Sequence, residues 1–193
     1  LIAAASDVYK RQLYQEHQRG NKVGYAKYET FPIWNLPLNH MVNLAYEAAT
    51  ADLNDVNMID PWHLEAYGKT TVNYNRDVEI FPVLKATFDK IYGKCPYKSP
   101  TDMGVNMAGN CIFDDEAVKE AANQEIIRRF YTAKCNQIKG RANKDEIYKL
   151  ELLMNNAGLS VDDRKCAVEA LKLEEETNAP CAAIELNDGT IVT

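Results

Sequence analysis

The stretch that decides the fold of this 193-residue chain runs from Val23 to Asp77. Its strand-forming residues Val23 to Thr30 are followed by a helical pattern from Asn39 to Asp52 and then by the apolar segment Val56-Asn57-Met58-Ile59. A strand, a helix and a second strand at this spacing are typical of a βαβ unit. Because such strands are commonly buried in a parallel sheet, we expect an α/β fold with a partial parallel sheet in this part of the chain.

Long helical patterns follow this stretch. Apolar residues keep to one face from Asn75 to Ile91, and Gly93 is a typical residue after a helix end. Further helices are expected after the capping residues Asp114, Asn143 and Ser160. These helices predict a helical subdomain in the middle of the chain.

The last residues have a different pattern. Two short apolar segments, Cys181 to Leu186 and Thr190 to Val192, flank the turn residues Asn187-Asp188-Gly189. This arrangement predicts a β-hairpin. We therefore divide the chain after residue 12 into residues 13–72, an α/β part, residues 73–159, the helical subdomain, and residues 160–193, the start of a truncated C-terminal α/β subdomain.

Composition excludes several classes of protein. The net charge is −6, which argues against a nucleic-acid-binding protein, because such a protein needs a basic face. No apolar run approaches the length of a membrane span, so we expect no membrane partner. The five cysteines are dispersed and odd in number, which indicates a reducing compartment, and we expect a cytoplasmic protein.

Residues 1–12 have a separate explanation. The segment Ala4-Ala5-Ser6-Asp7-Val8-Tyr9-Lys10-Arg11-Gln12 is similar to a translated transposase-based sequencing adapter. The alternative is a natural short helix, since alanine favours helices. We expect residues 1–12 to be an adapter artefact and leave them out of the fold prediction.

Several motifs resemble one uncharacterised family. They are Gly24-Tyr25-Ala26-Lys27-Tyr28-Glu29-Thr30-Phe31-Pro32, Ala48-Ala49-Thr50-Ala51-Asp52-Leu53, Asn57-Met58-Ile59-Asp60-Pro61, Thr71-Val72-Asn73-Tyr74-Asn75-Arg76-Asp77 and Ser99-Pro100-Thr101-Asp102-Met103-Gly104-Val105-Asn106-Met107. Together they resemble the domain of unknown function 1846 family (DUF1846, also called UPF0371), and the resemblance covers essentially everything after Gln12.

The resemblance implies a bacterial cytosolic protein of which this chain is an internal fragment. Family members carry, upstream of the part present here, a Gly-rich run ending Gly-Ser-Gly-Lys that is similar to a phosphate-binding loop. The resemblance therefore implies that residues 13–72 are the C-terminal part of a phosphate-loop or Rossmann-like, nucleotide-binding-like domain. ATP with Mg²⁺ would then be bound through a segment that this chain lacks.

Asp60 is the candidate metal ligand. It ends an apolar strand, which is where a phosphate-loop fold places the carboxylate that holds Mg²⁺. The alternative is a turn residue, and we weigh the two roles equally. His63 follows closely and is a candidate ligand-binding residue, although a single histidine after Pro-Trp is more often structural.

A second polar cluster consists of Asn73, Asn75, Arg76 and Asp77 at a predicted helix start. One interpretation is a clamp for an anion, because arginine offers a bidentate fork and helix N-termini favour anions. The other is a well-capped helix, which explains Asn and Asp but not Arg. We place one site where the Ile59-Asp60 strand ends, facing the Asn75-Arg76-Asp77 helix start, because ligands of open α/β sheets bind beyond the carboxyl ends of the strands. Thr101 and Asp102 are candidates for a second wall of this site, with turn and cap duty as the alternative.

These observations lead to a functional hypothesis without a reaction or a catalytic residue. We expect a nucleotide- or phosphate-dependent enzyme that acts on a small anionic metabolite. The alternative is a non-catalytic nucleotide-binding regulatory or assembly protein. A small-molecule ligand is expected in either case, and a homo-oligomer is compatible with both.

Overall fold

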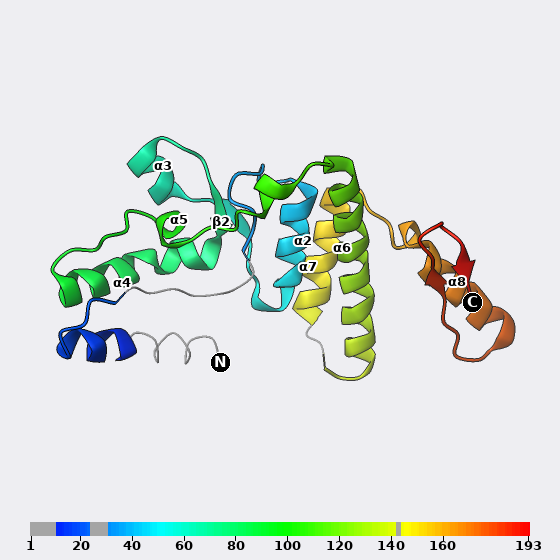
Figure 1. Ribbon diagram of the computed structural model, residues 1–193. Helices are drawn as coiled ribbons and strands as arrows, with labels where there is room; N and C mark the ends of the chain where they lie inside the picture. Colours follow the sequence, from blue (N-terminus) through cyan, green and yellow to red (C-terminus); the bar gives the residue numbers. More distant parts are fainter. Residues whose placement is uncertain (1–10, 24–30, 142–143) are drawn as a thin grey trace. The chain divides into compact units, whose positions relative to one another are not determined.

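The computed structural model describes residues 11–23, 31–141 and 144–193 (Figure 1). The chain divides into two compact units. Unit 1 contains the described residues up to Leu38 together with Asp55–Ile112, and unit 2 contains Asn39–Asn54 together with the described residues of Phe113–Thr193. Helices predominate in both units.

Unit 1 is built around a two-stranded sheet. Strand β1 (Asn57–Ile59) is followed by helix α3 (Pro61–Tyr67), and β2 (Val72–Tyr74) leads directly into α4 (Asn75–Tyr92). The two strands pair in antiparallel register, with Asn57 opposite Tyr74 and Ile59 opposite Val72. Helix α5 (Pro100–Met103) and the short helix η2 (Ala108–Cys111) follow later in the chain.

The predicted parallel-sheet α/β fold is wrong. The sheets that the described residues form are two small antiparallel pairs, β1 with β2 and β3 with β4. The expected helix after Asn39 exists as α2 (Met41–Ala49), but it belongs to unit 2 and does not connect two strands of one sheet. The expected strand from Val23 to Thr30 lies, apart from Val23, outside the described residues.

Unit 2 contains the larger apolar core. Helix α6 (Asp115–Ile138) packs against α2 and α7 (Lys144–Ala157), and the three helices lie side by side (Figure 1). Ile126, Ile127 and Phe130 of α6 meet side chains of α7 such as Leu150 in this core. Burying each such side chain stabilises the fold by roughly 1.5–3 kcal/mol. The unit also contains η1 (Ala51–Leu53), η3 (Val161–Asp163), α8 (Lys165–Thr177), β3 (Ile184–Glu185) and β4 (Ile191–Val192).

Local signals predicted several element boundaries correctly, but the helix expected after Ser160 was placed too early, since Ser160 caps η3 and α8 begins at Lys165. Helix α4 begins at Asn75 and ends before Gly93, which has the left-handed conformation. Asp114 caps α6 through a hydrogen bond from the Ala117 amide. The C-terminal hairpin turns at Asn187-Asp188-Gly189, as predicted.

Two further expectations stay predictions. Of the twelve residues interpreted as adapter sequence, the structure describes only residues 11 and 12, which lie in a helix spanning residues 11–18. The adapter interpretation therefore stays a prediction. The domain boundaries at residues 72 and 159 also stay predictions.

No helix in the described part of the chain is long and apolar enough to cross a membrane.

Pro82 lies inside α4, and a neighbouring side chain compensates for it. Proline has no N–H, so the carbonyl of Val78, four residues earlier, loses its helical hydrogen bond. The indole Nε1 of Trp62 donates to this carbonyl at 3.3 Å. Trp62 also packs against Phe81, with ring centroids 5.6 Å apart. A tertiary contact between α3 and α4 thus supplies the donor that the helix itself lacks.

We therefore predict coupling between Trp62 and Pro82. Trp62→Phe keeps an aromatic ring but removes the donor, and it should lower the free energy of unfolding by about 1–3 kcal/mol, the cost of an unsatisfied buried acceptor. In a Pro82→Ala background the helix regains its own N–H donor, so Trp62→Phe should cost less. A double-mutant cycle by urea denaturation measures this difference, and equal costs in both backgrounds would contradict the assignment.

A largely buried ion pair connects α2 and α7 in unit 2. Lys149 Nζ lies 3.5 Å from Glu47 Oε1, and the two side chains are only 12% and 10% exposed. Removing one member of a buried pair leaves the other charge uncompensated, which costs far more than the loss of an exposed pair.

Glu47→Ala should accordingly lower the free energy of unfolding by about 3–5 kcal/mol. Glu151→Ala is the matched control, because it also removes an α7 ion pair within unit 2, to Lys134 of α6 at 3.2 Å, but both side chains are more than 40% exposed. This control should cost no more than about 1 kcal/mol. Chemical denaturation of both variants checks the prediction, which is wrong if the two losses are similar.

Candidate functional site

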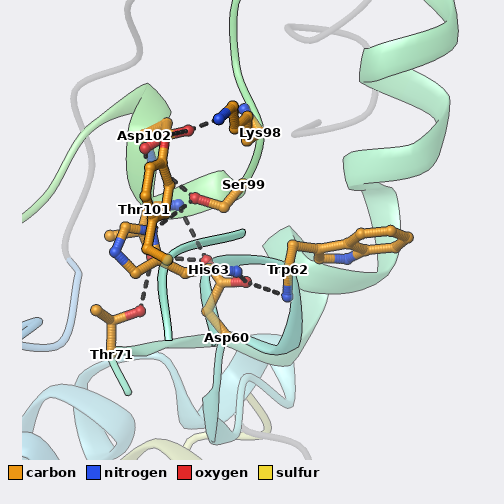
Figure 2. Close-up of polar contacts among 9 residues, drawn as sticks. Asp60, Trp62, His63, Thr71, Lys98, Ser99, Thr101 and Asp102 are labelled. Atoms are coloured by element: carbon orange, nitrogen blue, oxygen red, sulfur yellow. Dashed lines mark hydrogen bonds and ion pairs between the residues drawn. The ribbon is translucent and has the colours of Figure 1, made fainter. Parts of the chain in front are cut away.

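The carboxylate of Asp60 forms the centre of a buried polar network in unit 1 (Figure 2). Asp60 is fully buried and caps α3, because its Oδ1 accepts hydrogen bonds from the amides of Trp62 at 3.0 Å and His63 at 3.1 Å. Its Oδ2 accepts from the Thr101 amide at 3.1 Å and the Thr101 hydroxyl at 2.6 Å. One side chain therefore joins the start of α3 to α5.

Ser99, the capping residue of α5, connects α5 back to α3. Ser99 Oγ accepts from the Asp102 amide at 3.1 Å and shares a hydrogen bond of 2.9 Å with His63 Nδ1 on α3. Thr71, just before β2, shares a hydrogen bond of 2.9 Å with the Thr101 hydroxyl. Helices of seven and four residues are not stable alone, so these reciprocal caps hold both of them in place.

The outer part of this network is more exposed. Asp102 Oδ2 accepts from the Tyr67 hydroxyl at 2.9 Å and from the Lys98 amide at 2.8 Å. The hydrogen bond to Asp102 raises the pKa of Tyr67 above its ordinary value, because the neutral phenol is the donor. The Lys98 ammonium lies 5.2 Å from the centre of the Tyr67 ring. Protein groups therefore satisfy the network on its solvent side as well.

Asp60 does not fit a magnesium ligand in this arrangement. A carboxylate offers about four lone-pair positions, and all four hydrogen bonds just described end on Asp60. No lone pair is left to point at a cation. Among residues 11–23, 31–141 and 144–193, no three His, Cys, Asp or Glu side chains form a group that could hold a metal ion. The hydrogen bonds of Asp60 are those of a helix-capping residue.

Arg76 belongs to a second polar group at the start of α4. Its Nη2 pairs with Asp55 Oδ2 at 3.1 Å, and the Asp55 side chain is only 1% exposed, whereas that of Arg76 is 30% exposed. Asn75 Oδ1 accepts from the Val56 amide at 2.9 Å and so fixes the helix start to β1. The buried Asn73 accepts from the Tyr74 amide at 2.8 Å, and Asp77 lies in the first turn of α4.

The structure separates the predicted site residues into these two groups. Asp60, His63, Thr101 and Asp102 come together, while Asn73, Asn75, Arg76 and Asp77 form the other group. In the antiparallel pair, Asp60 follows the end of β1 and Arg76 follows the end of β2, so they lie beyond opposite ends of the sheet. A three-residue strand spans about 10 Å. The expected single site, with Asp60 facing Arg76, depended on the parallel sheet and is not formed.

Several members of both groups were not predicted from the sequence. Ser99 had a recognisable signal, because a serine before proline is a common helix start. Thr71, Tyr67 and Asp55 carry no comparable local signal, since their partners are distant in the sequence or lie in another element.

Comparisons with known proteins agree with the resemblance of the motifs. Residues 6–158 match the family described as "Domain of unknown function DUF1846, N-terminal". The chain is similar to proteins called "UPF0371 protein" from Streptococcus pneumoniae (strain JJA) and Streptococcus thermophilus (strain ATCC BAA-491 / LMD-9), each 60% identical over 181 residues. The match covers 94% of this chain but 37% of each relative, so the chain spans little more than a third of their length.

Asp60→Ala should be among the most destabilising substitutions in unit 1. It removes the acceptor of three amides and one hydroxyl, and leaving several buried donors unsatisfied should cost about 3–5 kcal/mol of unfolding free energy. Asp114→Ala is the matched control, since Asp114 also caps a helix but accepts one exposed hydrogen bond. Its loss should be about 1 kcal/mol. Urea denaturation compares the two, and a loss at Asp60 no larger than at Asp114 would refute the network's role.

Proposed function

This chain belongs to the DUF1846 (UPF0371) family, and from that premise we propose that it is part of a protein that binds a small anionic metabolite through Arg76. The family's name assigns it no activity, so the proposal rests on the chemistry of the second polar group. The proposed ligand carries a phosphate or carboxylate group.

One observation carries the proposal: Arg76 has more donors than its protein partner uses. A guanidinium has five N–H donors, and the hydrogen bond to Asp55 uses Nη2. Its Nε is buried and has no hydrogen-bond acceptor among the described residues. About a third of the side chain is exposed, so the proposed anion approaches from solvent and binds the Nη donors that the Asp55 bond does not use, while Nε lies inside.

The surroundings of Arg76 support this orientation. The buried Asp55 carboxylate holds the guanidinium in place, which reduces the entropy that a ligand would otherwise have to overcome. Arg76 also lies in the first turn of an 18-residue helix, where peptide dipoles favour an anion over a cation. The helix start has no side-chain cap. A bound anion would be stabilised by the helix and the arginine together.

We propose nucleotide binding and a chemical reaction only for the whole-length protein, not for this chain alone. The residues of this chain are proposed to bind and orient the anionic metabolite. Binding of ATP would depend on segments outside this chain. The non-catalytic regulatory or assembly protein remains the alternative, and turnover of the bound metabolite distinguishes the two.

The test is ligand binding by Arg76 variants of the whole-length protein. Inorganic phosphate, glucose 6-phosphate, citrate and ATP serve as probes in isothermal titration calorimetry. Arg76→Ala should weaken the best of these at least about tenfold, since hydrogen bonds to charged groups contribute ~1.5–3 kcal/mol. Arg76→Lys should restore part of the affinity, because it keeps the charge but not the fork geometry.

Arg128→Ala is the matched control, because Arg128 also pairs with a carboxylate, Glu125, but lies in unit 2 on α6. It should leave the affinity unchanged. If Arg76→Ala lowers stability but leaves the affinity for every probe intact, Arg76 serves only the ion pair with Asp55 and the proposal fails.

A further inference from the structure

The C-terminal hairpin and α8 are the least buried part of the described chain. None of the thirteen residues of α8 is buried, although they form a complete helix. Strands β3 and β4 have two residues each, and a hairpin of this size is marginally stable by itself. The hairpin contacts α8, but this contact leaves most of its apolar surface exposed.

One face of the hairpin is apolar and exposed. Ile184 is paired directly with Val192, and Leu186 follows two residues after Ile184, so the three side chains share a face. Their exposed fractions are 61%, 49% and 45% respectively. On the alternating positions, Ala183 and Ile191 are partly buried. A small sheet with apolar residues on both faces is typical of a sheet that is covered on both faces.

A hollow lies beside the same strand. An open hollow of about 540 Å³ is lined by Ile184 and Leu186 of the hairpin segment, by Glu120 and Gln124 of α6, and by the start of α8. Two large apolar side chains of its wall are in contact with solvent. Covering such apolar surface is favourable, so this place suits further packing residues.

The relatives contain many residues beyond the matched region. The match to the N-terminal family model ends at residue 158, so α8 and the hairpin lie outside that domain. The chain spans only 37% of the relatives that are 60% identical to it. We propose that, in the whole-length protein, the face formed by Ile184, Leu186 and Val192 is a docking surface for the polypeptide that follows Thr193. That polypeptide covers the face with apolar side chains and fills the hollow beside it.

Hydroxyl-radical footprinting of the whole-length protein tests this proposal, because side-chain modification follows solvent exposure. Ile184, Leu186 and Val192 should react as slowly as Ile126 and Ile127, which are fully buried in unit 2. Ile138 and Tyr148, which are 86% and 63% exposed, are the internal references for rapid reaction. The proposal is overturned if the three hairpin residues react as fast as Ile138.

Two further measurements complete the test: footprinting at several protein concentrations, and the Tm values of two substitution variants. If the hairpin residues are protected only at high protein concentration, a second copy covers them and the proposed occupant is wrong. Ile184→Glu should lower the Tm of the whole-length protein by about 3 °C or more, since it places a charge under the covering segment. Ile138→Glu, at an exposed position, should leave the Tm unchanged. Equal Tm values for the wild type and Ile184→Glu would also refute the proposal.

Discussion

Unit 1 depends on the four hydrogen bonds that end on the Asp60 carboxylate. A carboxylate is costly to bury unless donors surround it, and here two short helix starts supply them. The helices gain as much as the carboxylate does, because their first amides have no partner within the helix. Since α3 and α5 are too short to persist alone, the same contacts that satisfy Asp60 also determine where His63, Ser99 and Asp102 lie.

At two other places in unit 1, a residue that is unfavourable within its own helix is stabilised by a residue from another part of the chain. Pro82 removes a donor from α4, and Trp62 of α3 replaces it. Arg76 stands at a helix start where the helix dipole disfavours a cation, and the buried Asp55 compensates its charge. Each of these residues is unfavourable in its own helix and becomes acceptable through a residue from elsewhere in the chain. This coupling makes unit 1 sensitive to changes at positions far apart in the sequence.

The two units differ in what they bury. Unit 2 has a mainly apolar core in which Ile126, Ile127 and Leu150 are almost fully buried. Unit 1 has a sheet of only six residues and buries Asp55 and Asp60 near it. The further buried polar residues of this unit are Asn57, His63, Thr71, Asn73, Ser99 and Thr101. Polar groups cost free energy to bury and require matched partners, so they hold side chains in more specific positions than an apolar core does. This difference is the reason why we propose a binding site in unit 1 and not in unit 2.

The sequence by itself determined the family through its long motifs. It also determined the boundaries of the longer helices α4 and α6 and the C-terminal hairpin, because caps, turn residues and helical periodicity act within a few residues. It also selected Asp60 and Arg76 as unusual. The tertiary structure decided the direction in which β1 and β2 pair, and thereby placed Asp60 and Arg76 beyond opposite ends of the sheet. A three-residue strand has the same side-chain alternation in a parallel or an antiparallel pair, so no local pattern distinguishes the two. The pairings of Arg76 with Asp55, of Asp60 with Thr101 and of His63 with Ser99 join residues that are distant in the sequence, so only the folded chain shows them.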